Sequence, residues 1–289
     1  MSSSNNALKA DLALVFISFV WGATFVVIKR ALDDISPILF LAVRFLLAAA
    51  LLALYFRRDW FPSRAHWKGG AIVGACLAIG YAFQTVGLAG TTPANAGFIT
   101  GFYIPLVPLL MALVQRRLPS AAEGLGVLMA TVGLVLLTLP AEGFSVRRGD
   151  ILVLLGAISF AGQILFLAHY SKSIPYKVIS FTQVAVSGVL ASATFWWIDQ
   201  PVKAVWGSSA VWIAVISTAV FATAVAFAVQ SWAQAYATPT RTALIFALEP
   251  VFAWVTSYVM EGEILTPRAA VGALAIFAGI VLVELRGGK

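Results

Sequence analysis

Long apolar runs and short polar breaks alternate along almost the whole chain. Most runs hold about 20 residues, the length that an α-helix needs to cross the hydrocarbon core of a bilayer. The breaks carry turn-forming and charged residues, as at Thr91-Thr92-Pro93 and Thr238-Pro239. The pattern therefore predicts ten transmembrane helices, at residues 11–29, 37–56, 68–88, 94–115, 121–139, 150–169, 177–198, 209–235, 240–260 and 268–285.

The composition excludes a soluble protein. Of the 289 residues, 61% are apolar and 11% are charged, whereas soluble domains have roughly 45–50% apolar and about 25% charged residues. We therefore predict an all-α integral membrane protein whose surroundings are the lipid bilayer. A net charge of +7 would suggest nucleic-acid binding in a soluble chain. In a membrane protein the excess of Lys and Arg is typical of cytoplasmic loops, so no nucleic-acid partner is expected.

The residues that disulfides, metals and nucleotides require are scarce. Cys76 is the single cysteine and lies in an apolar run, and the two histidines, His66 and His169, are far apart. The sequence has no phosphate-binding G-x-x-x-x-G-K-[S/T] loop and no dinucleotide glycine motif. We therefore expect no disulfide, no metal site and no cofactor. The polar residues 1–10 look disordered and precede a first helix that we expect to stay uncleaved.

Lys and Arg are unevenly distributed between the two sides of the predicted bundle. With ten helices both termini lie on one side, and that side carries eleven Lys and Arg residues against six on the other. Because cytoplasmic loops are enriched in these residues, we predict that both termini are cytoplasmic. Arg44 falls inside the second helix, where we expect a structural anchor that reaches toward Asp33 or Asp34.

The two halves of the chain carry related sequences. Residues 81–94 (YAFQTVGLAGTTPA) match residues 227–240 (FAVQSWAQAYATPT) at an offset of 146, and Asp11 and Asp150 open their helices at an offset of 139. Each half holds five predicted helices, and this odd number makes the second half enter the membrane from the opposite side. We therefore predict two inverted five-helix repeats, the layout of many secondary transporters, at residues 11–138 and 150–285.

Four short motifs resemble those of one family. They are Trp21-Gly22-Ala23-Thr24-Phe25, Arg44-Phe45, Val107-Pro108-Leu109-Leu110 and Leu248-Glu249-Pro250-Val251-Phe252. With these motifs the chain resembles the EamA-like branch of the drug/metabolite transporter superfamily over almost its whole length. The resemblance implies a ten-helix carrier in the bacterial inner membrane that moves small metabolites, often amino acids, and usually exports them. We expect a monomer, and proton coupling stays open.

Polar side chains near the middle of the bilayer are the candidates for a binding site, because burying them in hydrocarbon is costly. At about 1.5 Å of rise per residue, Trp21, Tyr103 and Glu249 lie near the midplane, and Gln163 lies somewhat deeper than halfway along its helix. Trp21 and Tyr103 could equally pack between helices, and Gln163 could form an interhelical hydrogen bond. Glu249 should be protonated, paired with a cation or facing water, with a structural bond to helix ends as the alternative.

Gln84 and Gln230 are equivalent positions of the two repeats, and polar or aromatic neighbours such as Tyr81 recur around them at helical spacing. Their positions along the inverted halves predict that they lie toward opposite membrane surfaces. We therefore predict that the two glutamines line the outer and inner vestibules of one pathway. The alternative is that each bonds only to a neighbouring helix. Together, the candidate substrate-binding residues are Trp21, Tyr81, Gln84, Tyr103, Gln163, Gln230 and Glu249.

These patterns favour a secondary transporter that moves small organic metabolites, with amino acids as first choice from the resemblance, by alternating access of its two halves. An intramembrane enzyme or lipid-modifying protein is the alternative. It would need a paired acid and base, a nucleophile with its base, or a metal set within the bilayer, and Glu249 has no obvious catalytic partner in the sequence. A receptor or assembly factor that does not transport is disfavoured because it has little use for a carboxylate at the midplane.

Overall fold

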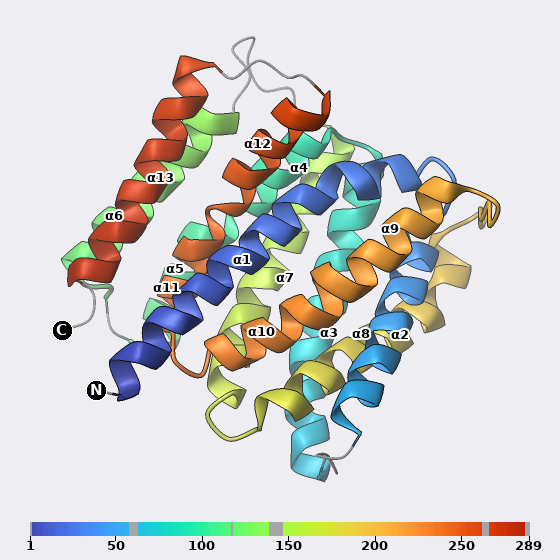
Figure 1. The fold of residues 1–289 in the computed structure, drawn as a ribbon, viewed down its shortest axis with the longest axis horizontal. Coiled ribbons are helices and arrows are strands. Elements are labelled where there is room, and N and C mark those ends of the chain that lie inside the picture. The colour runs from blue at the N-terminus through green and yellow to red at the C-terminus, as the bar shows by residue number, and fades with distance from the viewer. Residues whose placement is uncertain (1, 58–62, 117, 139–146, 262–265, 287–289) are drawn as a thin grey trace.

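The computed structural model describes residues 2–57, 63–116, 118–138, 147–261 and 266–286. The predicted all-helical class is confirmed for these residues, since every regular element among them is a helix (Figure 1). The elements are α1 (Ser2–Ala31), α2 (Pro37–Phe56), α3 (Arg64–Ala89), α4 (Pro93–Thr100), α5 (Tyr103–Gln115), α6 (Ala121–Thr138), α7 (Arg148–Tyr170), α8 (Tyr176–Ile198), α9 (Ser209–Ala219), the π-helix η1 (Val220–Val225), α10 (Ala226–Ala233), α11 (Pro239–Phe246), α12 (Glu249–Glu261) and α13 (Pro267–Arg286).

Several of these helices are long and apolar enough to cross a membrane, which confirms a multi-pass membrane protein. Among the described residues there are seven such stretches, Asn6–Ala31, Pro37–Phe56, Arg64–Ala89, Asn95–Val114, Arg148–Tyr170, Tyr176–Ile198 and Ser209–Ala233. Two shorter apolar helices, Ala121–Leu137 and Pro267–Val283, accompany them. The fifth predicted helix extends to residue 139, which lies outside the described residues.

The structure corrects the expectation for the N-terminus. Residues 1–10 were expected to be disordered, but α1 already begins at Ser2 and continues without a break to Ala31. Ala10 is fully buried in the core, together with Leu14 and Ile17 of the same helix. Because Ala10, Leu14 and Ile17 pack into the core, burial along α1 stabilises a helix that the polar composition does not predict.

α6 and α13 lie side by side at one edge of the molecule (Figure 1). A Cβ atom at Gly133 would lie 2.5 Å from the Gly272 carbonyl oxygen, and a Cβ at Gly126 would lie 2.8 Å from that of Gly279. No side chain fits at such distances, so glycine lets the two backbones touch. The crossing is symmetric in sequence as well, because Gly126 and Gly272 are equivalent at the offset of 146, and so are Gly133 and Gly279.

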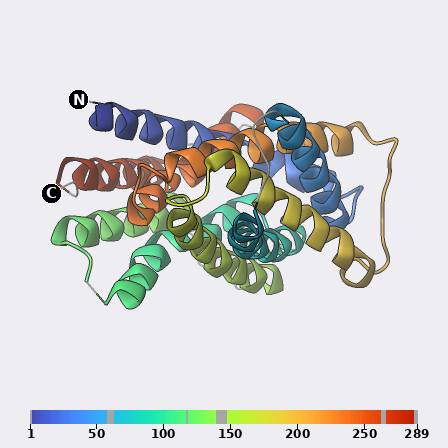
Figure 2. The ribbon, with the colours of Figure 1, turned by 90° about the horizontal axis from the view of Figure 1, so that it is seen from below.

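α1 runs through the middle of the view in Figure 1, begins at the upper margin of the molecule in Figure 2, and packs against α12, α9 and α10. α3 packs against α7 and α8, and α2 packs against α8. α1 begins and α13 ends on the same side of the molecule, as the two perpendicular views show (Figures 1 and 2). In most of these helix pairs, an element of the first half of the chain packs against one of the second half.

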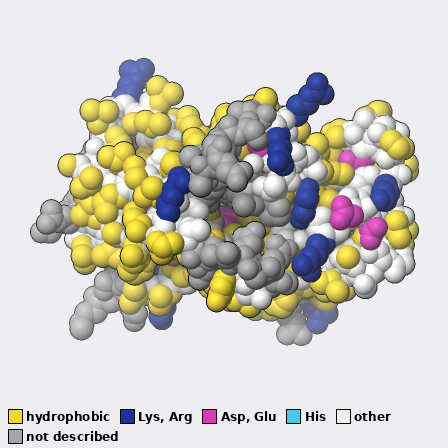
Figure 3. Space-filling view, turned by 90° about the horizontal axis from the view of Figure 1, so that it is seen from above, with side chains coloured by type: hydrophobic (Ala, Val, Ile, Leu, Met, Phe, Trp, Pro, Cys, Tyr) yellow, Lys and Arg dark blue, Asp and Glu magenta, His cyan; other side chains and the backbone are white. Residues whose placement is uncertain are grey.

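The outer surface around α6 and α13 is apolar, as expected for contact with lipid. Seen from above, hydrophobic side chains cover most of the left part of the molecule, whereas charged side chains gather toward the right (Figure 3). Exposed residues of the two helices include Leu125, Leu128, Val132, Val271, Leu274 and Phe277.

Candidate functional site

Two helical stretches are interrupted at positions that differ by 146 residues. α4 ends at Thr100 and α5 begins at Tyr103, while α11 ends at Phe246 and α12 begins at Glu249. Pro250 has no N–H group, so the carbonyl of Phe246, four residues earlier, lacks its usual helical donor. The Tyr103 hydroxyl donates to this carbonyl instead, at 3.2 Å. The first residue of α5, at the first break, is thus bonded to the last residue of α11, at the second break.

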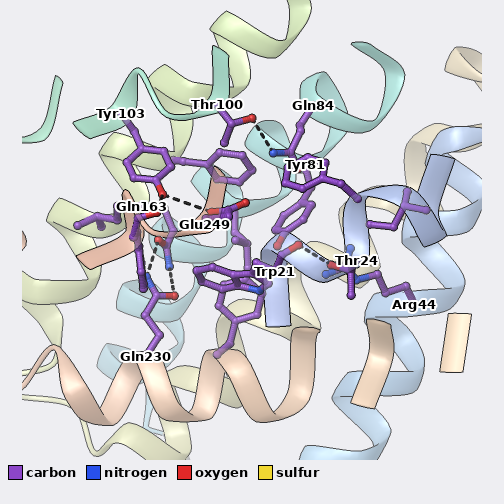
Figure 4. Close-up of a pocket in the computed structure, with 17 residues that line it drawn as sticks. Trp21, Thr24, Arg44, Tyr81, Gln84, Thr100, Tyr103, Gln163, Gln230 and Glu249 are labelled. Carbon is purple, nitrogen blue, oxygen red and sulfur yellow. Dashed lines mark hydrogen bonds between the residues drawn. The ribbon is translucent and has the colours of Figure 1, made fainter. Parts of the chain in front are cut away.

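Glu249 is the buried carboxylate beside this break. Its side chain lies among residues of both halves of the chain, and only 7% of the residue is exposed. The Tyr103 hydroxyl lies 3.3 Å from Glu249 Oε2, within hydrogen-bond distance (Figure 4). Tyr103 and Glu249 are equivalent positions at the offset of 146. The same place in each half therefore supplies a phenol in one case and a carboxylate in the other.

Arg44 is buried within the protein, and this corrects its predicted role as an anchor that reaches toward Asp33 or Asp34. Its Nε donates to Thr223 Oγ1 at 2.7 Å, and its Nη2 donates to the Ala222 carbonyl at 3.2 Å. The guanidinium carbon lies 4.8 Å from the centre of the Tyr81 ring, a cation–π distance. Acceptors on η1 and an aromatic face thus replace water around the guanidinium, so the side chain does not need to reach the surface.

Side-chain amides form a cluster opposite Arg44. Gln163 of α7 and Gln230 of α10 exchange hydrogen bonds of 3.4 and 3.3 Å, and Gln163 also donates to Gln183 of α8 at 3.1 Å. Gln183 in turn donates to Ser231 at 3.0 Å. Figure 4 shows Arg44 and the pair Gln163 and Gln230 on opposite sides of the view, with Glu249 between them.

Aromatic rings fill much of the space between these polar groups. The Trp21 ring lies 5.6 Å from Phe227 and 5.0 Å from Phe246, and the Tyr81 ring lies 5.1 Å from Phe160. The Trp21 indole Nε1 donates to the Ala222 carbonyl at 2.9 Å, which satisfies its one donor. The interhelical packing proposed as an alternative for Trp21 is therefore real, and the ring also faces the cavity.

These groups line one cavity, whose empty space of about 560 Å³ includes solvent that is open to the outside. All seven candidate residues line it, as do ten residues that the sequence did not single out as binding residues: Thr24, Phe25, Ile28, Arg44, Leu77, Thr100, Phe160, Ile164, Phe227 and Phe246. The charged residues of this lining are Arg44 and Glu249. Arg44 had a usable signal, since it is the one charged residue of the second predicted helix.

Gln84 and Gln230 line the same cavity, and the hypothesis that they line vestibules toward opposite membrane surfaces stays a prediction. Gln84 donates to Thr100 at 2.9 Å, whereas Gln230 bonds to Gln163. Their positions along the helices suggested opposite surfaces. Figure 4 shows the two glutamines at opposite margins of the cavity that they share. Each glutamine also bonds to a neighbouring segment, so the hydrogen bonds of the alternative are present, but neither side chain is confined to them because both line the cavity.

Comparisons with known proteins agree with these features. A family model described as the EamA-like transporter family matches residues 8–139 and 147–285. An uncharacterized transporter of Archaeoglobus fulgidus is 38% identical over 96% of this chain and 87% of its own length. The uncharacterized inner membrane transporter YedA of Escherichia coli is 27% identical over 52% of this chain and 50% of its own. One crystal structure shares the fold with a TM-score of 0.77 at 19% identity, over 96% of both chains.

Proposed function

Because this chain belongs to the EamA-like transporter family, we propose that it is a secondary carrier of small organic metabolites, with amino acids as its substrates and export as its direction. The transporter class rests on the family and on the relatives. The amino-acid substrate is carried by one observation, the presence of a buried cation and a buried carboxylate in the lining of the same cavity. The relatives favour no enzyme activity, and no observation on the cavity favours one.

The cavity's chemistry is that of a zwitterion site. An amino acid carries a carboxylate, which matches the guanidinium of Arg44, and an ammonium group, which matches Glu249. The rings of Trp21, Tyr81 and Phe227 would pack against an apolar or aromatic side chain. Glu249 can also exchange a proton with the pathway, so we include proton coupling in the proposal. No observation calls for a second chain, and we propose a monomer.

We propose ten membrane spans arranged as two inverted repeats, residues 11–138 and 150–285. The cavity supports this arrangement because most of its lining residues come in equivalent pairs. At the offset of 139 the pairs are Trp21 with Phe160, Thr24 with Gln163 and Phe25 with Ile164, and at the offset of 146 they are Tyr81 with Phe227, Gln84 with Gln230, Thr100 with Phe246 and Tyr103 with Glu249. A two-fold axis in the membrane plane would place each pair on opposite sides of one central site.

The orientation of this arrangement is testable by cysteine labelling. In a Cys76→Ala background, a cysteine at Gly207, in the exposed loop between α8 and α9, should react with a membrane-impermeant maleimide in intact cells. A cysteine at Ser2 should react only after permeabilisation, because the Lys and Arg distribution places the termini in the cytoplasm. Labelling of position 2 from outside, or protection of position 207, would contradict the proposed topology.

The substrate is testable in vesicles that contain the purified protein and a panel of labelled amino acids. We expect uptake of at least one of them, and Arg44→Gln should lower it about tenfold, because a charge-assisted hydrogen bond contributes roughly 1.5–3 kcal/mol. Arg57→Gln, at the exposed end of the same helix, is the matched control and should transport as the original protein does. Vesicles that take up no member of the panel would contradict the amino-acid proposal. Equal losses in both variants would contradict the role of Arg44.

A further inference from the structure

The eighth predicted membrane span contains a feature that its sequence does not announce. Between α9 and α10 the chain makes the π-helical turn η1, and the N–H of Ala226 donates to the carbonyl of Phe221, five residues earlier. In an α-helix the N–H group donates to the carbonyl four residues earlier. Single π-helical turns within an α-helix are rare overall, but those that occur often lie at functional sites. The apolar sequence Val220-Phe221-Ala222-Thr223-Ala224-Val225 holds no proline or glycine that would force a break.

The π-helical turn receives side chains from two helices of the first half. The Ala222 carbonyl accepts a hydrogen bond from Trp21 of α1 at 2.9 Å and one from Arg44 of α2 at 3.2 Å. The next residue, Thr223, accepts a bond from Arg44 Nε at 2.7 Å through its hydroxyl. Two successive residues of η1 thus hold two donors of the same guanidinium, and one of them also holds the indole.

Thr223 does not line the cavity, and it is fully buried. Its repeat equivalent at the offset of 146 is Leu77, which has no hydroxyl. Other buried threonines, such as Thr218, donate to a carbonyl of their own helix, in that case Ala214 at 2.6 Å. Thr223 differs from them because its hydroxyl accepts a hydrogen bond from a charged side chain of another helix.

We propose that η1 acts as a positioning element, in which Thr223 and the Ala222 carbonyl hold Arg44 in the orientation that binds the carboxylate of the substrate. This inference rests on the proposed function, since it takes Arg44 to contact the substrate. A guanidinium has five N–H donors in a fixed plane, and η1 occupies Nε and Nη2. Fixing the plane in advance removes the cost of ordering a long side chain when the ligand binds.

The specific consequence is that Thr223 affects the binding of ligands that carry a carboxylate and does not affect the binding of other ligands. In Thr223→Val the shape is kept, but Arg44 Nε loses its acceptor and the guanidinium must turn to find another. We expect the affinity for carboxylate ligands to fall about tenfold, which is the cost of one long side chain left unordered before binding. Ligands that have only an ammonium group should bind as before.

Three labelled probes distinguish these cases in equilibrium binding to the purified full-length protein. L-Phenylalanine carries both charges, 3-phenylpropionate carries only the carboxylate, and 2-phenylethylamine carries only the ammonium group. Thr223→Val should weaken binding of the first two and leave the third unchanged, and Thr223→Ser should restore binding. Thr218→Val is the matched control and should behave as the original protein. In an Arg44→Lys background, which has no Nε–H, Thr223→Val should add no further loss.

An equal loss for all three probes, or an equal loss in Thr218→Val, would show that Thr223 only supports the fold and would overturn the proposal. Unchanged binding of every probe in Thr223→Val would overturn it as well. If the original protein binds none of the probes and takes up no member of the amino-acid panel, the amino-acid function itself fails and this inference falls with it. That result can be told apart from the first two because it is measured on the unsubstituted protein.

Discussion

Replacing Glu249 by glutamine should lower transport about 100-fold while the protein still folds. Glutamine has nearly the same shape, and its NH2 group can donate to the Tyr103 hydroxyl oxygen, which now lies 3.3 Å from Oε2, while that hydroxyl still donates to the Phe246 carbonyl. The negative charge is lost, however, and with it the proposed partner for an ammonium group in a cavity lined largely by aromatic and aliphatic side chains. Removing one member of such a buried charge pair costs about 3 kcal/mol, which corresponds to the expected loss.

The measurement is initial uptake in vesicles at several pH values, for the amino acid that gives the highest signal. If Glu249 also couples transport to protons, the residual uptake of Glu249→Gln should no longer change with pH. Asp33→Asn, at an exposed position outside the cavity, is the control and should leave uptake unchanged. Tyr103→Phe should show a smaller loss, because it removes a hydrogen bond and no charge. Uptake by Glu249→Gln that equals the original at every pH would leave Glu249 a purely structural role.

Gly22→Ala should damage both stability and transport. A Cβ atom at Gly22 would lie 2.4 Å from the Glu249 carbonyl oxygen and 2.8 Å from the Ala253 backbone nitrogen. Backbone atoms cannot turn aside as the end of a long side chain can, so α1 and α12 would have to separate. Overpacking of this kind costs typically 1–3 kcal/mol, and here it would also displace the residue that begins α12.

The check is a pair of thermal unfolding curves with the corresponding uptake rates. Gly124→Ala is the matched control, because nothing lies within 4 Å of a Cβ atom at Gly124. We expect Gly22→Ala to lower the unfolding temperature by several degrees. In large domains each kcal/mol of lost stability lowers this temperature by about 2–4 °C. Transport should fall with it, since Glu249 moves. If Gly22→Ala behaves like Gly124→Ala in both measurements, the close contact of α1 and α12 is not needed.

Two threonine–proline pairs and the apolar runs explain why parts of the fold could be predicted from the sequence. Thr92 and Thr238 accept hydrogen bonds from the backbone three residues later and are each followed by proline in the first helical turn. A Thr-Pro pair starts a helix by itself, because the cap and the fixed proline angle are local properties. The apolar content of the runs is equally local, so the membrane class and most helix boundaries follow from the sequence.

The gathering of the seven candidate residues in one cavity was also within reach of the sequence. The cost of a polar group in hydrocarbon is high wherever the helix lies, so Glu249, Gln163 and Tyr103 had to face a cavity or one another. Counting residues along a helix estimates how deep each residue lies in the membrane. It does not measure the tilt of the helix or the direction in which a side chain points, so it could not show that Gln84 and Gln230 line the same cavity.

The sequence by itself thus determined the apolar runs, the polar segments between them and the polar residues that must avoid lipid. The tertiary structure alone decided which of these residues meet. Arg44 depends on Thr223, 179 residues away, and on a π-helical turn that no proline or glycine marks. Gly133 depends on Gly272 of α13. Such contacts are set by the rotation and crossing of helices from the two halves. Another sequence with the same pattern of apolar runs would have the same predicted spans, but its helices could be rotated or crossed differently.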